Sequence, residues 1–240
     1  MQRTFQPTHY YNTFGPHEPA FCVEDGDTVL TTTLDARGGD AARQQRGERG
    51  NPLTGPIAVR GAEPGDALQV AIEMVRPNRA YGFCGNAVAA HVVDASYVPQ
   101  LPAAALAEWE VDADRHTATL VSPQTRLTGA TLPLEPMLGC IGVAPPQHQA
   151  IASSTSGPYG GNMDYRGLGA GTTLYLPVYE PDALLFVGDG HAIQGDGEIV
   201  GMGIEISMDV RLTVRVLKGK KIGWPRGENT DYIFTMGNAR

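Results

Sequence analysis

The sequence predicts a mainly β protein with some α structure, and three observations favour this class. Glycine (30 residues) and proline (18 residues) separate short apolar segments instead of gathering in low-complexity tracts. Such punctuation is typical of β-rich folds with many turns. Residues 205–216 alternate apolar and polar side chains with a period of two, as in a strand with one solvated face. Few windows show the period of an α-helix.

Eight segments have the apolar composition expected of strands. In chain order they are residues 20–23, 28–34, 57–59, 67–74, 117–121, 173–177, 184–187 and 205–216. A helix is expected at 103–109, and a weaker helical pattern covers 85–93. The polar, glycine-containing residues 34–55 predict a long loop, and long loops in compact domains are usually functional or disordered.

The length of 240 residues suits one large β-rich domain or two smaller ones. We expect two closely packed portions, residues 1–136 and residues 137–240, which could form a single structural unit. The net charge of −8 offers no basic surface for phosphate and argues against nucleic-acid binding. No apolar run of 18 or more residues and no apolar signal core occur, so we expect a soluble cytoplasmic protein that does not bind membranes.

Residues 187–205 carry the strongest functional signal. Here an apolar segment runs into glycine-rich backbone that carries Asp189, His191, Asp196, Glu198 and Glu205. Glycine-rich backbone at the end of a strand can expose such side chains together in a cleft. The pattern therefore predicts a metal site or an acid–base site.

Five segments in fixed order connect this region to a known family. They read NPLTGPI at 51–57, GAEPGD at 61–66, GCIGVAP at 139–145, GNMD at 161–164, and a run at 174–198 that ends in GDGHAIQGDGE. The collinear combination, from about residue 22 to about residue 216, resembles the acetamidase/formamidase family. Residues 76–136 carry little of this resemblance.

The resemblance implies hydrolysis of a small linear amide, such as formamide or acetamide, to a carboxylate and ammonia. It also implies a jelly-roll-like β-sandwich portion packed against a smaller α+β portion, a homo-oligomer (a dimer or larger), and a divalent metal ion. Because a fold does not determine chemistry, the residues themselves must support this function.

An unactivated amide requires a strong nucleophile, a stabilised oxyanion and a protonated leaving nitrogen. A divalent ion held by Asp and His side chains can supply the first two. Asp189 and His191 flank one glycine, and residues two apart in an extended strand project to the same side. We predict them as metal ligands together with Asp164, and Asp35 as a fourth. Mixed nitrogen and oxygen donors favour zinc, whereas a carboxylate-only set favours a harder ion such as calcium.

Glu198 and Glu205 are the candidates for general base and general acid, and the sequence does not assign the two roles between them. Structural roles compete with each of these predictions. Asp189 precedes glycine and could simply form a turn, Asp35 could form an Asx-turn, and Glu205 could cap or form a salt bridge at the start of a strand.

Other chemistries fit the sequence less well. No G-x-S-x-G motif occurs, and the apolar neighbours of Cys140 indicate a buried small side chain instead of a nucleophilic thiol. The competing class of function is a non-catalytic, metal-containing β-sandwich that binds a small polar ligand or a carbohydrate. Such a module usually presents aromatic platforms, yet Trp109 and Trp224 are both far in sequence from the acidic cluster.

Overall fold

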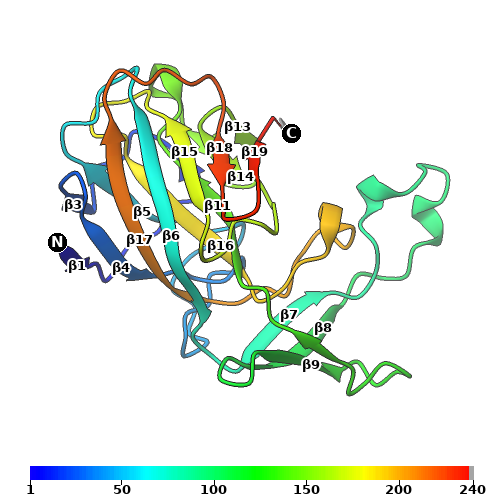
Figure 1. The fold of residues 1–240 in the computed structure, drawn as a ribbon. Helices are drawn as coiled ribbons and strands as arrows, with labels where there is room; N and C mark the ends of the chain where they lie inside the picture. The colour runs from blue at the N-terminus through cyan, green and yellow to red at the C-terminus, as the bar shows by residue number, and fades with distance from the viewer. Residues whose placement is uncertain (238–240) are drawn as a thin grey trace.

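The computed structural model describes residues 1–237, and within this range the strands form four sheets (Figure 1). The largest sheet has seven strands, in the spatial order β1 (Gln2–Thr4), β4 (Thr28–Thr32), β17 (Met208–Leu217), β6 (Ala67–Pro77), β15 (Thr173–Pro177), β18 (Arg226–Glu228) and β19 (Ile233–Thr235). The second has six, in the order β13 (Ser156–Gly157), β14 (Gly160–Asn162), β11 (Met137–Gly142), β16 (Leu185–His191), β5 (Thr54–Val59) and β3 (Phe21–Val23).

The two smaller sheets lie outside this pair. One has the order β10 (Thr131–Pro133), β9 (Thr117–Ser122), β8 (Leu106–Asp112) and β7 (Tyr81–Gly85), and the other pairs β12 (Ile151–Ala152) with β2 (Thr13–Phe14). The helical segments in residues 1–237 are four short 3-10 turns, η1 (Ala90–Val92), η2 (Val98–Gln100), η3 (Pro146–His148) and η4 (Asp196–Glu198). None of the described helices has the length and hydrophobicity needed to span a membrane.

The alternating pattern of residues 205–216 forms most of the strand that it predicts, and the strand begins at Met208. Met208, Val210, Leu212 and Val214 are buried, whereas the polar residues between them are at least partly exposed. β17 pairs with β4 on one side and with β6 on the other, so it lies within the seven-stranded sheet. One face of this sheet therefore contributes to the core and the other faces outward.

The core joins the two large sheets. A single cluster of buried apolar side chains includes Val70 and Leu212 from the seven-stranded sheet and Ile141 and Phe186 from the six-stranded sheet. Full burial of a side chain of this size contributes about 1.5 to 3 kcal/mol. The predicted β-rich class is confirmed, and the two sheets pack as a sandwich.

Both large sheets combine strands from distant parts of the chain. β4 pairs with β17, and β5 pairs with β16. Each predicted portion, 1–136 and 137–240, thus supplies strands to the same two sheets.

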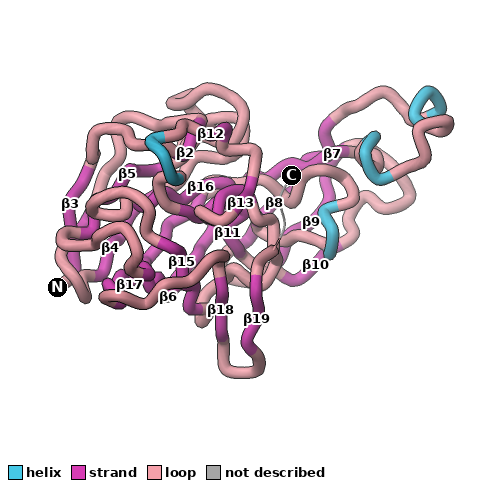
Figure 2. Tube along the Cα trace, turned by 90° about the horizontal axis from the view of Figure 1, so that it is seen from above, coloured by secondary structure: helices cyan, strands magenta, loops and turns pink. Residues whose placement is uncertain are grey.

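The sheet of β7 to β10 projects from the sandwich, and the loop between β7 and β8 extends furthest from it (Figures 1 and 2). The helix predicted at 103–109 is wrong, because most of this segment belongs to β8. Alanine and glutamate favour a helix locally, but Ala107 and Val111 alternate onto a buried face and β8 pairs with both β7 and β9. Pairing with neighbouring strands outweighs the intrinsic helix propensity of the segment.

Candidate active site

The end of β16 places two candidate ligands in the interior. Asp189 and His191 are buried, with 3% and 0% of their surface exposed. Gly190 between them packs against Met208 and the backbone of Ile206, so a larger residue would not fit there. Asp189 has a left-handed backbone (φ 55°), a conformation that non-glycine residues rarely adopt. The two side chains converge as predicted, but regular strand alternation is not the reason.

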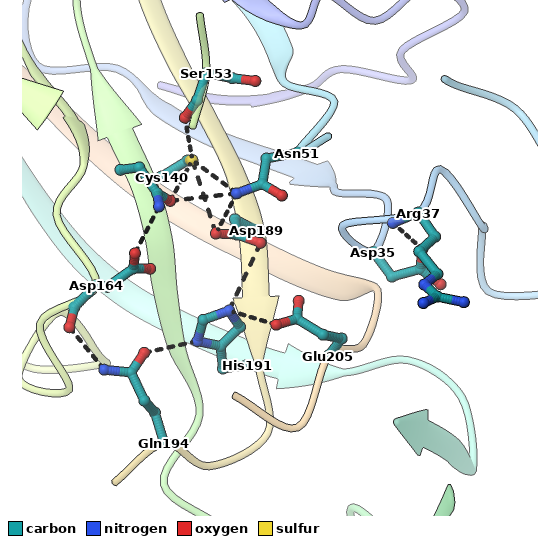
Figure 3. A network of polar contacts seen from close by, with 11 residues as sticks. Asp35, Arg37, Asn51, Cys140, Ser153, Asp164, Asp189, His191, Gln194 and Glu205 are labelled. Carbon is teal, nitrogen blue, oxygen red and sulfur yellow. Dashed lines mark hydrogen bonds and ion pairs between the residues drawn. The ribbon is translucent and has the colours of Figure 1, made fainter. Parts of the chain in front are cut away.

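Four acidic side chains, those of Asp164, Asp189, Glu198 and Glu205, lie around His191. Figure 3 labels His191 with Asp164, Asp189 and Glu205. Nε2 of His191 lies 3.1 Å from Oε1 of Glu205 and 3.6 Å from Oδ1 of Asp189. Donor atoms of Asp164, Asp189 and His191 lie within 4.8 Å of one another, and so do those of His191, Glu198 and Glu205. The structure therefore brings together all the predicted site residues except Asp35.

Gln194 sets the orientation of the imidazole. Its Nε2 donates a hydrogen bond to the backbone carbonyl of Asp164 (2.6 Å), so its Oε1 is the atom that faces Nδ1 of His191 at 2.8 Å. A carbonyl oxygen only accepts hydrogen bonds, so Nδ1 carries the proton. In the neutral ring, Nε2 then presents a lone pair to the carboxylates, as a metal-ligating histidine must.

Two asparagines orient the two aspartates. Nδ2 of Asn51 donates to Oδ2 of Asp189 (2.8 Å), and Nδ2 of Asn162 donates to Oδ2 of Asp164 (2.5 Å). Asn51 belongs to the predicted long loop and has a left-handed backbone (φ 58°). Each candidate ligand therefore has one carboxamide side chain that fixes its direction.

Gly139 on β11 leaves the space in which the two aspartates approach each other. A methyl group at this position would lie 2.6 Å from Oδ1 of Asp164 and 2.6 Å from Oδ2 of Asp189. Both carboxylates therefore need a residue without a side chain beneath them.

The cluster has the character of a cation site. Oδ1 of Asp189, Nε2 of His191 and Oε2 of Glu205 are buried and have no hydrogen-bond partner among the described residues. Burying such atoms without a hydrogen-bond partner costs free energy. A divalent cation could be bound by the two carboxylate oxygens and by the imidazole nitrogen. The donors are one nitrogen and several carboxylate oxygens, which is a set that zinc accepts.

Burial has the largest effect on the pKa values of this cluster. It raises the pKa of Glu205 to about 8, assisted by the charges of Asp189 and Glu198 and opposed by His191. Burial alone would lower the pKa of His191, but the charges of Glu205 and Asp189 raise it well above 6.5. Protons therefore remain on this cluster, where they offset the negative charge of the buried carboxylates. A bound cation would offset the same charge.

A cleft of about 380 Å³ connects the cluster to the surface. Its lining includes Asn51, Asn162, Asp189, Glu198 and Glu205. Glu198 lies in η4 with a left-handed backbone (φ 44°) and is 9% exposed. A small ligand in this cleft would contact the predicted catalytic pair and one candidate metal ligand together.

Asp35 has a different role from the predicted one. Its Oδ2 forms an ion pair with Arg79 at 2.7 Å, and both side chains are almost fully buried. Its Oδ1 accepts hydrogen bonds from the backbone N–H groups of Arg37 and Gly39. This is the Asx-turn that competed with the metal prediction, and it uses both carboxylate oxygens to hold the loop. The structure does not place Asp35 in the cluster.

Cys140 lies beside the site without the features of a nucleophile. Its thiol is fully buried, and its Sγ lies 3.0 Å from Oδ1 of Asn162 and 3.2 Å from the carbonyl of Ser153. Burial, together with the negative charges of Asp189 and Asp164, raises the pKa of this thiol well above its usual value. The reactive thiolate is therefore disfavoured.

The carboxamides of Asn51, Asn162 and Gln194 were not predicted as site residues. Local signals existed for two of them, because Asn162 precedes Asp164 by two residues and Gln194 follows His191 by three. Asn51 had no local signal, since its partner Asp189 is 138 residues away in the chain.

Known proteins resemble this chain in sequence and in fold. The model of the acetamidase/formamidase family matches residues 2–156 and 148–234. A formamidase of Methylophilus methylotrophus is 28% identical, with 91% of this chain and 67% of that protein covered. An acetamidase of Mycolicibacterium smegmatis is 29% identical, with 78% of this chain and 58% of that protein covered.

A solved structure of an acetamidase from Yersinia enterocolitica is 28% identical and superposes with a TM-score of 0.80, covering 98% of this chain and 74% of that one. The chain spans between 58% and 67% of the length of the curated relatives that it matches.

Proposed function

The chain belongs to the acetamidase/formamidase family, and from this premise we propose that it hydrolyses the C–N bond of a linear primary amide, releasing a carboxylate and ammonia. The reaction would take place at the cluster around His191. The observation that carries the proposal is the cluster of buried carboxylate and imidazole donor atoms around His191, three of whose acidic members line a cleft.

Asp164, Asp189 and His191 would hold a divalent ion, and the mixed nitrogen and oxygen donors favour zinc. When bound, such an ion acidifies a water molecule and polarises a carbonyl oxygen. The side chains of the protein do the rest of the work. Asn51, Asn162 and Gln194 fix the direction of the three ligands, which is a function that outer hydrogen-bond partners perform in metal sites.

Glu198 and Glu205 would transfer the protons. Both line the cleft, and their donor atoms form one group with that of His191. One carboxylate would accept the proton of the attacking water, and a protonated carboxyl group would then deliver a proton to the leaving nitrogen. The pKa of Glu205, raised to about 8, favours its protonated form at neutral pH, so Glu205 would deliver the proton and Glu198 on the cleft wall would accept it.

Elemental analysis combined with an ammonia assay tests this function. The purified protein should contain one divalent ion per chain and release ammonia from formamide or acetamide. His191→Ala should remove both the ion and the activity, whereas Glu198→Gln should retain the ion and lose at least about 100-fold in kcat. His116→Asn is the matched control, because His116 is exposed, far in sequence from the site, and has a left-handed backbone that asparagine tolerates.

Two results would contradict the proposal in different ways. Ammonia release that continues unchanged in the metal-free protein would exclude the role of the ion. A metal-loaded protein that binds amides without releasing ammonia would instead be a binding module.

We also propose a homo-oligomer, as the family resemblance implies, and light scattering on the purified protein measures its mass.

A further inference from the structure

A second cleft, of about 680 Å³, lies next to the candidate active site. One wall is the loop between β7 and β8, and the other includes residues 200–202, which follow η4. Figure 1 shows this loop projecting from the sandwich, with the segment around η4 between the two. The cleft is larger than the 380 Å³ cleft above the cluster.

The lining of the second cleft is mainly apolar. The largest apolar side chains in it are those of Val88, Leu101, Leu106, Val200 and Met202, and several alanines fill the spaces between them. The polar side chains in the lining are those of Arg37, Asn86 and His91. A cleft of this composition favours an uncharged, hydrophobic group.

Backbone hydrogen bonds hold the two walls in place. The N–H of Ala89 donates to the carbonyl of Ile199 (2.8 Å), which ties the β7–β8 loop to the segment after η4. Asn86 and Ala105 close the base of the loop. The backbone N–H of Asn86 donates to the carbonyl of Ala105 (3.1 Å), and the N–H of Ala105 donates to Oδ1 of Asn86 (3.0 Å). The cleft is therefore preformed, and a ligand would not have to order it.

The two clefts are continuous. Arg37, His91, Gly201 and Met202 line both of them. The guanidinium of Arg37 lies 5.2 Å from the ring centre of Phe83, so its position at the junction is supported by an aromatic face. A molecule whose reacting atoms contact the cluster could extend past Gly201 and Met202 into the apolar cleft without leaving the protein surface.

We propose that the second cleft binds the acyl chain of the substrate, which is then a primary amide of a hydrophobic acid with about four to eight carbons. The inference rests on the proposed amide hydrolysis at the His191 cluster. Formamide, with one carbon, one nitrogen and one oxygen, occupies only a small part of the first cleft. Each cleft alone, at about 380 and 680 Å³, has the volume of a site for a larger ligand, about 300 to 1,000 Å³.

A homologous series of amides measures the contribution of the cleft. Formamide, acetamide, butanamide and hexanamide are compared as substrates of the metal-loaded full chain. We expect kcat/KM to rise about threefold for each added methylene up to hexanamide, because each methylene leaves water for an apolar surface. Ala104→Trp places a large ring in the second cleft and should remove this dependence on chain length. Ala103→Trp is the matched control, since Ala103 is the neighbouring residue in the same loop but does not line the cleft.

The outcomes separate this inference from the proposed function. A flat or falling series in an enzyme that hydrolyses acetamide overturns the acyl-chain cleft and leaves the amidase function standing. If no amide is hydrolysed, the proposed function fails, and binding still tests the cleft through methyl NMR signals of Val200 and Met202 during titration with hexanamide. Signals that do not move overturn the inference. A dimer that dissociates in Ala104→Trp would assign the cleft to a second copy of the chain and would also overturn it.

Discussion

The proton on Nδ1 of His191 is assigned by hydrogen bonds that begin at the backbone. The carbonyl of Asp164 orients the amide of Gln194, and this amide in turn orients the imidazole. A reversed amide would leave two acceptors, its own oxygen and the carbonyl of Asp164, facing each other. The proton on Nδ1 of His191 is therefore a property of the fold and does not depend on a bound ligand.

Gln194→Leu tests this arrangement. Loss of the amide should weaken divalent-ion binding about 10- to 100-fold, because the ring would lose its fixed tautomer and orientation. Competition with a chelating dye measures the affinity, and nitrogen-15 NMR of His191 reports the tautomer in the metal-free protein at a pH high enough for the ring to be neutral. Gln149→Leu, at an exposed position away from the cluster, should change neither measurement. An unchanged tautomer in Gln194→Leu would contradict the assignment.

The sequence predicted which residues form the cluster better than it predicted the backbone and the hydrogen-bond partners that hold them in place. Asp189, His191, Glu198 and Glu205 lie within one glycine-rich segment, so their proximity follows from local backbone. The left-handed backbone of Asp189 did not follow, because it depends on packing between strands that are distant in sequence. The role of Asn51 depends in the same way on the path of a long loop.

At the scale of elements, Asp66 joins the turn before β6 to the end of β17. Its carboxylate accepts hydrogen bonds from Nζ of Lys218 (2.9 Å) and from the N–H groups of Gly219 and Glu63 (both 2.8 Å). Burial, the largest single influence, would raise the pKa of Asp66, but the hydrogen bonds from Lys218, Gly219 and Glu63 together lower it below 3.8. The ionised form is thus favoured in the folded state.

A pH-dependent loss of stability follows. Because the folded-state pKa of Asp66 lies below its unfolded value, its contribution is fully present above pH 3.8 and is lost as the pH falls through the folded pKa. Asp66→Asn should reduce the free energy of unfolding at pH 7 by about 1 to 3 kcal/mol, the contribution of charge-assisted hydrogen bonds. Urea unfolding of both proteins should show this difference shrinking below pH 3.8. The exposed Glu18→Gln should have no comparable effect, and a difference that persists at low pH would contradict the prediction.

The predictability of each strand depended on its burial pattern. β15 has the predicted bounds, because one face of the strand is buried and the other is partly exposed. β11 was not predicted, since all six of its residues are buried and its sequence shows no alternation. β8 was predicted as a helix because strand pairing, which decides its structure, cannot be read from the segment itself.

At the scale of the whole molecule, the β7–β8 loop is separable from the core. No residue from 86 to 106 is buried, and none belongs to the apolar cluster of the sandwich. Replacing residues 87–104 with an Asn-Gly turn should therefore change Tm by less than about 3 °C, a shift that corresponds to roughly 1 kcal/mol for a chain of this size.

Calorimetry measures this effect, with a core variant as the comparison. Leu212→Ala, in the middle of β17, should cost about 2 to 5 kcal/mol, because it leaves a cavity between the sheets. A loss of that size in the shortened protein would show that the loop stabilises the sandwich. If the loop serves only the second cleft, its removal should alter selectivity among amides and leave thermal stability intact.

The pairing of β4 with β17 has a consequence for synthesis of the protein. Thr28 lies opposite Thr213, so a ribosome must deliver the 185 residues that separate them before this sheet can close. Until then the early strands have unpaired edges, and closure must bring together segments at large contour separation. We expect refolding on the timescale of milliseconds to seconds or slower, and a nascent chain that depends on protection from aggregation until β17 is available for pairing.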